Sequence, residues 1–221
     1  QTEARLITQA RSIYAGGDAK GAVLRYEQVL KEKPKCIAAL AGLAYIRMEQ
    51  KYYDEAETLF RRALSVDEGD AFCLEMLGGI LYEQHRFDEA LAAFNRSLEQ
   101  KPDGALCYNY IGAISQKKGE MAAAEQAFLK AITIRPNYAD AHFNLALFYA
   151  LQKTPFIDLA RKHYRKARDL GGPQNPMMED FLNKASKPGS ETQKSAAKPD
   201  DENGQVLLKE NSALKEKLKT L

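Results

Sequence analysis

The chain has 221 residues, of which 45% are hydrophobic and 28% charged, and its 32 Lys and Arg residues nearly balance its 30 Asp and Glu residues. This composition fits a globular or helical-array protein with enough chain to bury a core, and it gives no global argument for binding nucleic acid or an acidic membrane surface. No stretch approaches the roughly 18 consecutive apolar residues that would predict a membrane-spanning helix.

A regular spacing of 34 residues runs through most of the chain. An alanine recurs at this spacing, an aromatic residue follows each alanine by four positions, and a smaller residue follows three positions later. The three columns are Ala22, Ala56, Ala90 and Ala124; Tyr26, Phe60, Phe94 and Phe128; and Val29, Ala63, Ser97 and Ala131. Spacings of four and three place these residues on one face of a helix, and a period of this length predicts stacked helical hairpins.

In chain order, the predicted repeats are 3–36, 37–70, 71–104 and 105–138, with a modified fifth repeat at 139–172. The first helix of each repeat has apolar residues at positions 4 and 7 and a small residue at position 8. The second helix carries the three columns, and a proline ends it in three of the repeats. We expect Gly16 and Gly17 to form a turn, and Gly78 and Gly79 to serve close helix packing.

The columns are clearest in the segments KYYDEAETLFRRALSVD and HRFDEALAAFNRSLEQKPD, and in NYIGAISQKKGEMAAAEQAFLKAITIRPNYADAHFNLALFYA, which crosses one repeat junction. These segments resemble the tetratricopeptide repeat (TPR) family, and the resemblance covers residues 3–172. It implies an all-α fold, a right-handed α-solenoid of stacked helix-turn-helix units, to which the sequence adds an extra C-terminal helix. The chain departs from the family's pattern at Gln9, Arg47 and Glu68.

The fifth unit contains a two-residue insertion around Thr154 and Pro155, so its columns fall two places late. Because proline is tolerated in the first helical turn, we expect Pro155 to start the second helix of this unit. The stretch from Asn144 to Gly172 is similar to the closing unit of some bacterial TPR proteins.

After the repeats, residues 173–185 contain an amphipathic segment that we interpret as a capping helix, with a free recognition helix as the alternative. Residues 186–204 are polar and rich in Pro, Gly and Ser, which predicts a flexible linker. Residues 205–221 predict a helix with leucines at intervals of seven and an asparagine at a core position, a pattern typical of parallel coiled-coil dimers. Because the pattern is short, three interpretations stay open: homodimerisation through this segment, a longer coiled coil, and docking of the helix on the array. The oligomeric state stays open as well.

Three cysteines, Cys36, Cys73 and Cys107, leave an odd number for pairing. Cys73 and Cys107 occupy the same position in neighbouring repeats, where packed helices lie about 8–10 Å apart, beyond the roughly 7 Å that a disulfide spans. We therefore expect free, mostly buried thiols, which favour a soluble cytoplasmic protein. The chain begins at Gln1 rather than Met, so an exported location stays open.

No residue pattern predicts catalysis. His85, His142 and His163 lack metal-ligand spacing, so we expect them to have packing or surface roles. The acidic pairs at 54–55 and 88–89 fall at helix N-termini, where carboxylates complement the helix dipole. The sequence therefore predicts a protein that is not an enzyme and binds no cofactor or metal.

In the TPR family, ligand contacts come mainly from the first helices, at positions 2, 5, 9, 12 and 13 of the repeat as counted in the windows given above. The resemblance therefore implies a peptide-binding groove formed by Tyr45, Met48, Phe72, Glu75, Tyr82, Leu106, Asn109, Gln116 and Phe143. Aromatic and apolar side chains with a few hydrogen-bonding groups suit a bound peptide or helix, and we expect Asn109 to clamp its backbone. The cations of the family's clamp for a C-terminal carboxylate are missing from the corresponding positions, so that binding mode is not expected.

A basic helix supports an alternative function. Its cations are Arg161, Lys162, Arg165, Lys166 and Arg168. They could contact nucleic acid or another anionic surface, or they could complement a helix C-terminus in solvent, and we favour the second interpretation. The sequence thus predicts a non-enzymatic scaffold or adaptor that binds a peptide or helix of a partner protein in its concave groove, with nucleic-acid or anionic-surface binding as the alternative. The identity of the partner, its pathway and the organism stay open.

Overall fold

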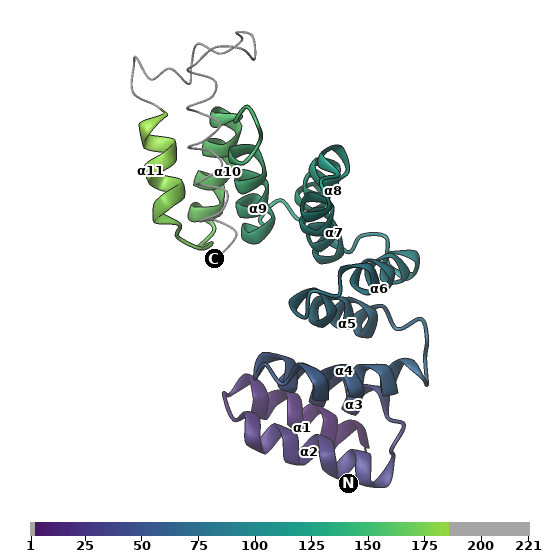
Figure 1. Ribbon diagram of the computed structural model, residues 1–221. Helices are drawn as coiled ribbons and strands as arrows, with labels where there is room; N and C mark the ends of the chain where they lie inside the picture. The colour runs from purple at the N-terminus through teal and green to yellow at the C-terminus, as the bar shows by residue number, and fades with distance from the viewer. Residues whose placement is uncertain (1–2, 186–221) are drawn as a thin grey trace. The chain divides into compact units, whose positions relative to one another are not determined.

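The computed structural model describes residues 3–185, and within this range the chain consists of α-helices joined by short turns (Figure 1). The helices are α1 (Glu3–Ala15), α2 (Ala19–Glu32), α3 (Ile37–Glu49), α4 (Tyr53–Leu64), α5 (Ala71–Glu83), α6 (Phe87–Gln100), α7 (Ala105–Lys118), α8 (Met121–Ile134), α9 (Ala139–Ala150), α10 (Ile157–Asp169) and α11 (Pro176–Lys184). Two helices fall in each of the predicted repeat windows, and α11 follows them. The linker predicted at 186–204 and the helix or coiled coil predicted at 205–221 lie outside the described residues.

The chain divides into two compact units: unit 1 runs from Gln1 to Ile114 and unit 2 from Ser115 to Leu221, with the boundary inside α7. Within unit 1, α1 packs against α2, α3 against α4 and α5 against α6, and Figure 1 shows these pairs as successive hairpins. Neighbouring hairpins meet through α2 and α3 and through α4 and α5. Within unit 2, α9 packs against α10 and contacts α8, while α11 contacts α10.

The alanine and aromatic columns form the core of the hairpins. Their buried members are Ala22, Tyr26, Ala56, Phe60, Ala90 and Phe94 in unit 1, and Ala124 and Phe128 in unit 2. The aromatic rings press against glycines on neighbouring helices. A Cβ added at Gly42 would lie 2.3 Å from the ring of Tyr26, and one at Gly78 would lie 2.6 Å from the ring of Phe94. Gly78 occupies position 8 of its repeat, which is small there because the Phe94 ring needs the space, whereas Gly42 occupies position 6 and makes room for Tyr26 of the preceding repeat.

One turn geometry recurs between the two helices of a repeat. Gly17, Lys51, His85 and Gly119 are spaced 34 residues apart and have φ values of 89°, 63°, 61° and 81°. The backbone N–H of Lys51 donates to the carbonyl of Met48, and the N–H of Tyr52 donates to the carbonyl of Arg47. These two bonds close the end of α3. Glycine adopts this left-handed conformation without steric cost, whereas Lys51 and His85 adopt it against their preference.

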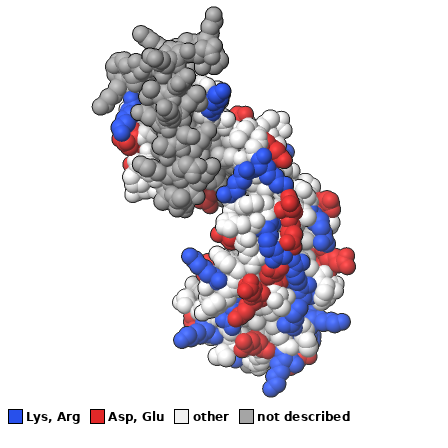
Figure 2. Space-filling view, viewed as in Figure 1, with Lys and Arg blue, Asp and Glu red and all other residues white. Residues whose placement is uncertain are grey.

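The second helices of unit 1 are linked by ion pairs. Glu57 on α4 lies 2.8 Å from both Arg61 and Arg86, and Arg86 also lies 2.7 Å from Glu89. The expected acidic pairs at 54–55 and 88–89 do occupy the first turns of α4 and α6. On the face shown in Figure 2, basic and acidic side chains are interspersed. This pattern is that of a solvated surface with local charge pairing.

The start of α10 differs from the sequence-based expectation. This helix begins at Ile157 after Phe156 as its N-cap residue, so the prediction that Pro155 starts it is wrong. The two-residue insertion lengthens the connection, and Pro155 lies within it, before the cap. A proline at the start of a helix does occur in α11, where Pro176 follows the N-cap residue Asn175.

Candidate functional site

An aromatic cluster lies on the first helices of unit 1. The rings of Tyr14 on α1 and Tyr45 on α3 meet edge to face with centroids 6.1 Å apart, and Tyr45 lies 6.4 Å from Phe72 on α5. Phe72 is 48% exposed although it is a large apolar residue. We call the surface that carries Tyr14, Tyr45, Phe72, Gly79 and Tyr82 the aromatic face.

Tyr82 lies near the C-terminal end of α5, where it extends the aromatic face toward α7. Its half-buried ring is 4.9 Å from the ring of Tyr110, and Tyr110 stacks on Phe94 at 5.2 Å with an interplanar angle of 10°. Burial, together with the negative charge of Glu83, raises the pKa of the Tyr82 phenol. The side chain is therefore a neutral hydrogen-bonding group held in place by the stacked rings behind it.

The five predicted ligand-contacting positions of α1, α3 and α5 carry an excess of negative charge. Their charged residues are Arg11, Glu49, Glu75 and Glu83. Burial raises the pKa of the Tyr14 phenol, and the negative charge of Glu49 raises it further. This carboxylate therefore lies near the aromatic cluster. Burial raises the pKa of the Tyr26 phenol, and the positive charge of Arg11, the cation of the set, opposes that rise, which places Arg11 beside Tyr26. The aromatic face thus combines the exposed ring of Phe72, three half-buried tyrosine rings and net negative charge.

Two adjacent glycines in α5 have different surroundings. The contact between a Cβ at Gly78 and the Phe94 ring confirms the expectation of close helix packing there. A Cβ at Gly79 would have no heavy atom within 4 Å, so the same expectation for Gly79 is wrong. A glycine within a helix costs about 0.5–1 kcal/mol relative to alanine, and helix packing does not require one here. Gly79 leaves open space at the position that Tyr45 fills one repeat earlier.

The remaining predicted groove residues lie in different environments. Met48 and Leu106 are half-buried and pack against the core of unit 1, and Glu75 is also half-buried. Asn109, the expected peptide clamp, is only 5% exposed and has an interaction within the chain. The structure brings Tyr45, Phe72 and Tyr82 onto the aromatic face.

Two predicted groove residues belong to unit 2. Gln116 is half-buried near the end of α7, and the ring of Phe143 on α9 lies 6.2 Å from that of Tyr164 on α10. The contact of Phe143 is thus with the second helix of its own hairpin.

The basic helix is α10, and two of its five predicted cations have structural partners. Arg161 donates to the carbonyl of Leu182 near the end of α11 at 3.0 Å, and Arg168 donates to the carbonyl of Gly172 at 2.5 Å. Lys162, Arg165 and Lys166 are exposed on the helix surface. Arg161 and Arg168 therefore stabilise the junction with α11 rather than offering both of their guanidinium groups to an anionic partner.

A buried histidine pair in unit 2 was not identified from the sequence. The Nδ1 atoms of His142 on α9 and His163 on α10 lie 3.0 Å apart, and Nε2 of His142 lies 3.1 Å from the carbonyl oxygen of Pro136. Since a carbonyl only accepts, we assign the proton of His142 to Nε2, and the Nδ1–H of His163 then donates to Nδ1 of His142. Burial lowers the pKa of both imidazoles, and that of His163 falls to about 4.

A sequence signal for this pair exists in the repeat columns. His142 occupies position 4, the core position that Leu74 fills in the third repeat. Once the two-residue insertion is removed, His163 falls in the column of Ala127, which is buried on α8. Both histidines therefore occupy columns that face the interior of a hairpin.

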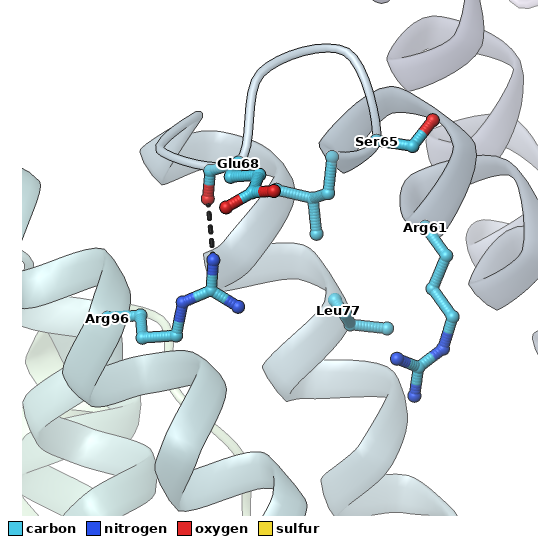
Figure 3. Close-up of a pocket in the computed structure, with 6 residues that line it drawn as sticks. Arg61, Ser65, Glu68, Leu77 and Arg96 are labelled. Atoms are coloured by element: carbon cyan, nitrogen blue, oxygen red, sulfur yellow. Dashed lines mark hydrogen bonds between the residues drawn. The ribbon is translucent and has the colours of Figure 1, made fainter.

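A pocket of about 370 Å³ lies where α4, α5 and α6 meet (Figure 3). Its lining residues are Arg61, Leu64, Ser65, Glu68, Leu77 and Arg96. Arg96 donates to the backbone carbonyl of Glu68 at 2.9 Å, and Arg61 pairs with Glu57 at 2.8 Å. Both guanidinium groups already have protein partners. This pocket is therefore a gap where two repeats pack together, and it does not resemble an anion site.

The cysteines are free thiols, as expected, with Cys36 half-buried and Cys73 and Cys107 buried. Burial raises the pKa of Cys107 to about 11, so this thiol is protonated and unreactive at neutral pH. Between residues 3 and 185, no cluster of three or more His, Cys, Asp or Glu residues is arranged to hold a metal ion. In the same range, every helix falls short of the length and apolarity needed to cross a membrane.

Solved structures with the same fold include PilW, PilF and YrrB, each at low identity. PilW, described as a widely conserved type IV pilus biogenesis factor, is 23% identical with a TM-score of 0.74, covering 94% of this chain and 99% of that one. PilF of Pseudomonas aeruginosa is 20% identical with a TM-score of 0.72, covering 98% and 91%. YrrB, described as a TPR protein with an unusual peptide-binding site, is 21% identical with a TM-score of 0.61, covering 81% and 90%. These similarities show the fold.

Sequence comparison identifies the family. No curated protein matches the chain. Three family models described as tetratricopeptide repeat match residues 35–103, 75–139 and 127–169. The matched segments overlap and run from the second hairpin of unit 1 to the end of α10. The chain belongs to the tetratricopeptide repeat family.

Proposed function

We propose that this protein is a non-enzymatic scaffold that binds a peptide or helix of a partner protein on the aromatic face of unit 1. The observation that carries the proposal is the exposure of Phe72 within a row of ring contacts that joins α1, α3 and α5. Exposed aromatic groups that are held rigidly by neighbouring rings lose little entropy on binding, which makes them effective anchors for a partner. The TPR fold and similar structures such as YrrB support a role in protein interaction.

A displayed library of random 16-residue peptides can test this proposal on the full chain. We expect the selected peptides to bind the Phe72→Ser variant about tenfold more weakly than the unmodified protein, because an apolar anchor at the centre of an interface is lost. Leu24→Ser is the matched control, since Leu24 is an exposed apolar residue on α2 in the same unit, away from the aromatic face. Equal loss in both variants, or no loss in either, would contradict the proposal.

The alternative function, binding of an anionic surface through α10, is not favoured by the contacts of this helix. Arg161 and Arg168 are engaged with backbone carbonyls, and three exposed cations on one helix are common on a solvated surface. Binding driven by phosphate contacts would weaken steeply between low and moderate salt. Binding on the aromatic face, where apolar contact supplies most of the affinity, should weaken by no more than about tenfold over the same range.

A further inference from the structure

Gly79 marks an opening in an otherwise filled row of side chains. One repeat earlier, the same position holds Tyr45, whose ring contacts Phe72 on the next first helix at 6.4 Å. At Gly79 the corresponding space is open, because a Cβ there would have no heavy atom within 4 Å. The residue that corresponds to Phe72 in the next repeat is Leu106, which is half-buried against the core. The row of side chains on the aromatic face is therefore interrupted at Gly79, where an added Cβ would meet open space.

Acidic residues lie on the same face of α5 as the open position and at the equivalent place on α3, the first helix of the preceding repeat. Glu83 follows Gly79 by four residues, so it lies one turn along the same face of α5. Glu49 occupies the position of Glu83 one repeat earlier, and both side chains are exposed. Glu75 precedes Gly79 by four residues and adds to the negative charge. Arg11, the cation at these positions of α1, α3 and α5, lies beside Tyr26 on the first repeat.

We infer that the open position at Gly79 receives a large apolar side chain of the partner segment, and that a Lys or Arg of the same segment lies against Glu83 and Glu49. This inference rests on the proposed function and narrows the partner to a basic, amphipathic protein segment. Apolar contact supplies most of the affinity in such an arrangement, while the charges select the partner and speed its association. A segment with acidic residues at the same places would be repelled.

The peptide library described above tests the inference through three variants of the full chain. Gly79→Trp fills the opening, Gly79→Ala adds a single methyl group there, and the double change Glu49→Gln and Glu83→Gln removes two charges without changing size. All three changes lie at half-buried or exposed positions, and circular dichroism and thermal melting of each variant establish that it is folded.

We expect the peptides selected by the unmodified protein to contain more Lys and Arg than the library, next to large apolar residues. Their binding should fall about tenfold with Gly79→Trp, because an occupied opening excludes the anchor, and change less than about threefold with Gly79→Ala. The double Gln variant should weaken binding about tenfold at low salt, with a smaller effect at high salt.

The outcomes separate this inference from the proposed function. Peptides that depend on Phe72 but show no excess of Lys and Arg, or that bind Gly79→Trp unchanged, would overturn the inference and leave the proposed function standing. A library that yields no peptide dependent on Phe72 would overturn both. Residues 205–221 contain four lysines and two glutamates among several leucines. If a synthetic peptide of this segment displaces the selected peptides at equal concentration, the occupant is the chain itself and the assignment to a separate partner fails.

Discussion

Units 1 and 2 both pack aromatic rings between their helices, but unit 2 adds side-chain hydrogen bonds at the centre of its hairpins. In unit 1, the contacts between first helices are made by rings, from Tyr14 through Tyr45 to Phe72. In unit 2, buried side-chain hydrogen bonds connect the helices, and the centre of α9 and α10 is the pair of His142 and His163. Apolar contacts do not depend on the protonation of any group, whereas a buried imidazole pair does. The two units should therefore respond differently to cavities and to acid.

Tyrosine–carboxylate contacts extend the polar character of unit 2. The hydroxyl of Tyr149 on α9 donates to Glu125 on α8 at 2.6 Å, and that of Tyr164 on α10 donates to Glu179 on α11 at 2.8 Å. Burial raises the pKa of both phenols, so they remain donors at neutral pH. Each helix of unit 2 from α8 to α11 is thus joined to the next by at least one hydrogen bond between side chains that are at least partly buried.

The largest effect should come from removing a ring in unit 1. Phe94→Ala removes a completely buried ring that contacts Gly78 and stacks on Tyr110. We expect a loss of about 3–5 kcal/mol in the free energy of unfolding, because the cavity cannot close around so large a missing group. Amide hydrogen exchange resolved by segment measures it, and the loss should appear in α5 and α6. A loss below about 1 kcal/mol would mean that the aromatic column does not carry the packing of this hairpin.

Acid should destabilise unit 2 before unit 1. His163 has a folded-state pKa of about 4, well below its ordinary value of 6.5, because burial and the neighbouring His142 and Lys162 disfavour its charged form. Between these two pH values the unfolded chain binds more protons than the folded chain, so stability is complete above pH 6.5 and falls as the pH drops toward 4. We expect a loss of about 2 kcal/mol by pH 5, measured as reduced protection of α9 and α10 after correction for the intrinsic pH dependence of exchange.

A double variant is the control for this acid response. His142→Leu with His163→Phe replaces both hydrogen-bonding partners by apolar groups of similar size, which keeps the interior filled without leaving either imidazole unpaired. The decline between pH 6.5 and 5 should then disappear. In unit 1 the pKa values of Glu57 and Glu89 are lowered by Arg61 and Arg86, so their contribution falls only below about pH 4.5. Equal acid sensitivity of both units in the unmodified protein at pH 5 would refute the comparison.

The repeat columns were predictable from the sequence because they depend on spacing alone. Residues separated by three and four positions share a helix face whatever their neighbours are, so the buried alanines and Phe94 could be named in advance. The turn at Lys51 gave no such signal, since lysine is not a residue that favours a positive φ. The burial of Asn109 was not predictable for a related reason: the repeat position predicts which side of the helix a residue occupies, but not how deeply neighbouring side chains bury it.

The next prediction concerns the two glycines of α5, which the sequence could not distinguish. Gly78→Ala should cost about 1–3 kcal/mol, because its Cβ would meet the rigid, buried ring of Phe94 at 2.6 Å. Gly79→Ala should instead raise stability by up to about 1 kcal/mol, because alanine favours the helix and nothing lies within reach of the new methyl group. Chemical denaturation of the two variants measures both values. A loss of stability with Gly79→Ala would show that the space at Gly79 is filled in solution, and a gain with Gly78→Ala would show that the Phe94 ring moves aside.

The smallest expected effect concerns the turns, where unit 1 carries strain that unit 2 avoids. Lys51 has a φ of 63° in the turn position that Gly119 occupies in unit 2 with a φ of 81°. Lys51→Gly should raise stability by about 1 kcal/mol, since glycine enters the left-handed region without a clash of its Cβ with the following carbonyl. Lys51→Ala keeps the Cβ and removes the charge, so it should leave stability within about 0.5 kcal/mol of the unmodified protein. If alanine and glycine stabilise equally, the lysine's charge rather than its backbone conformation is unfavourable, and the turns of the two units are equally relaxed.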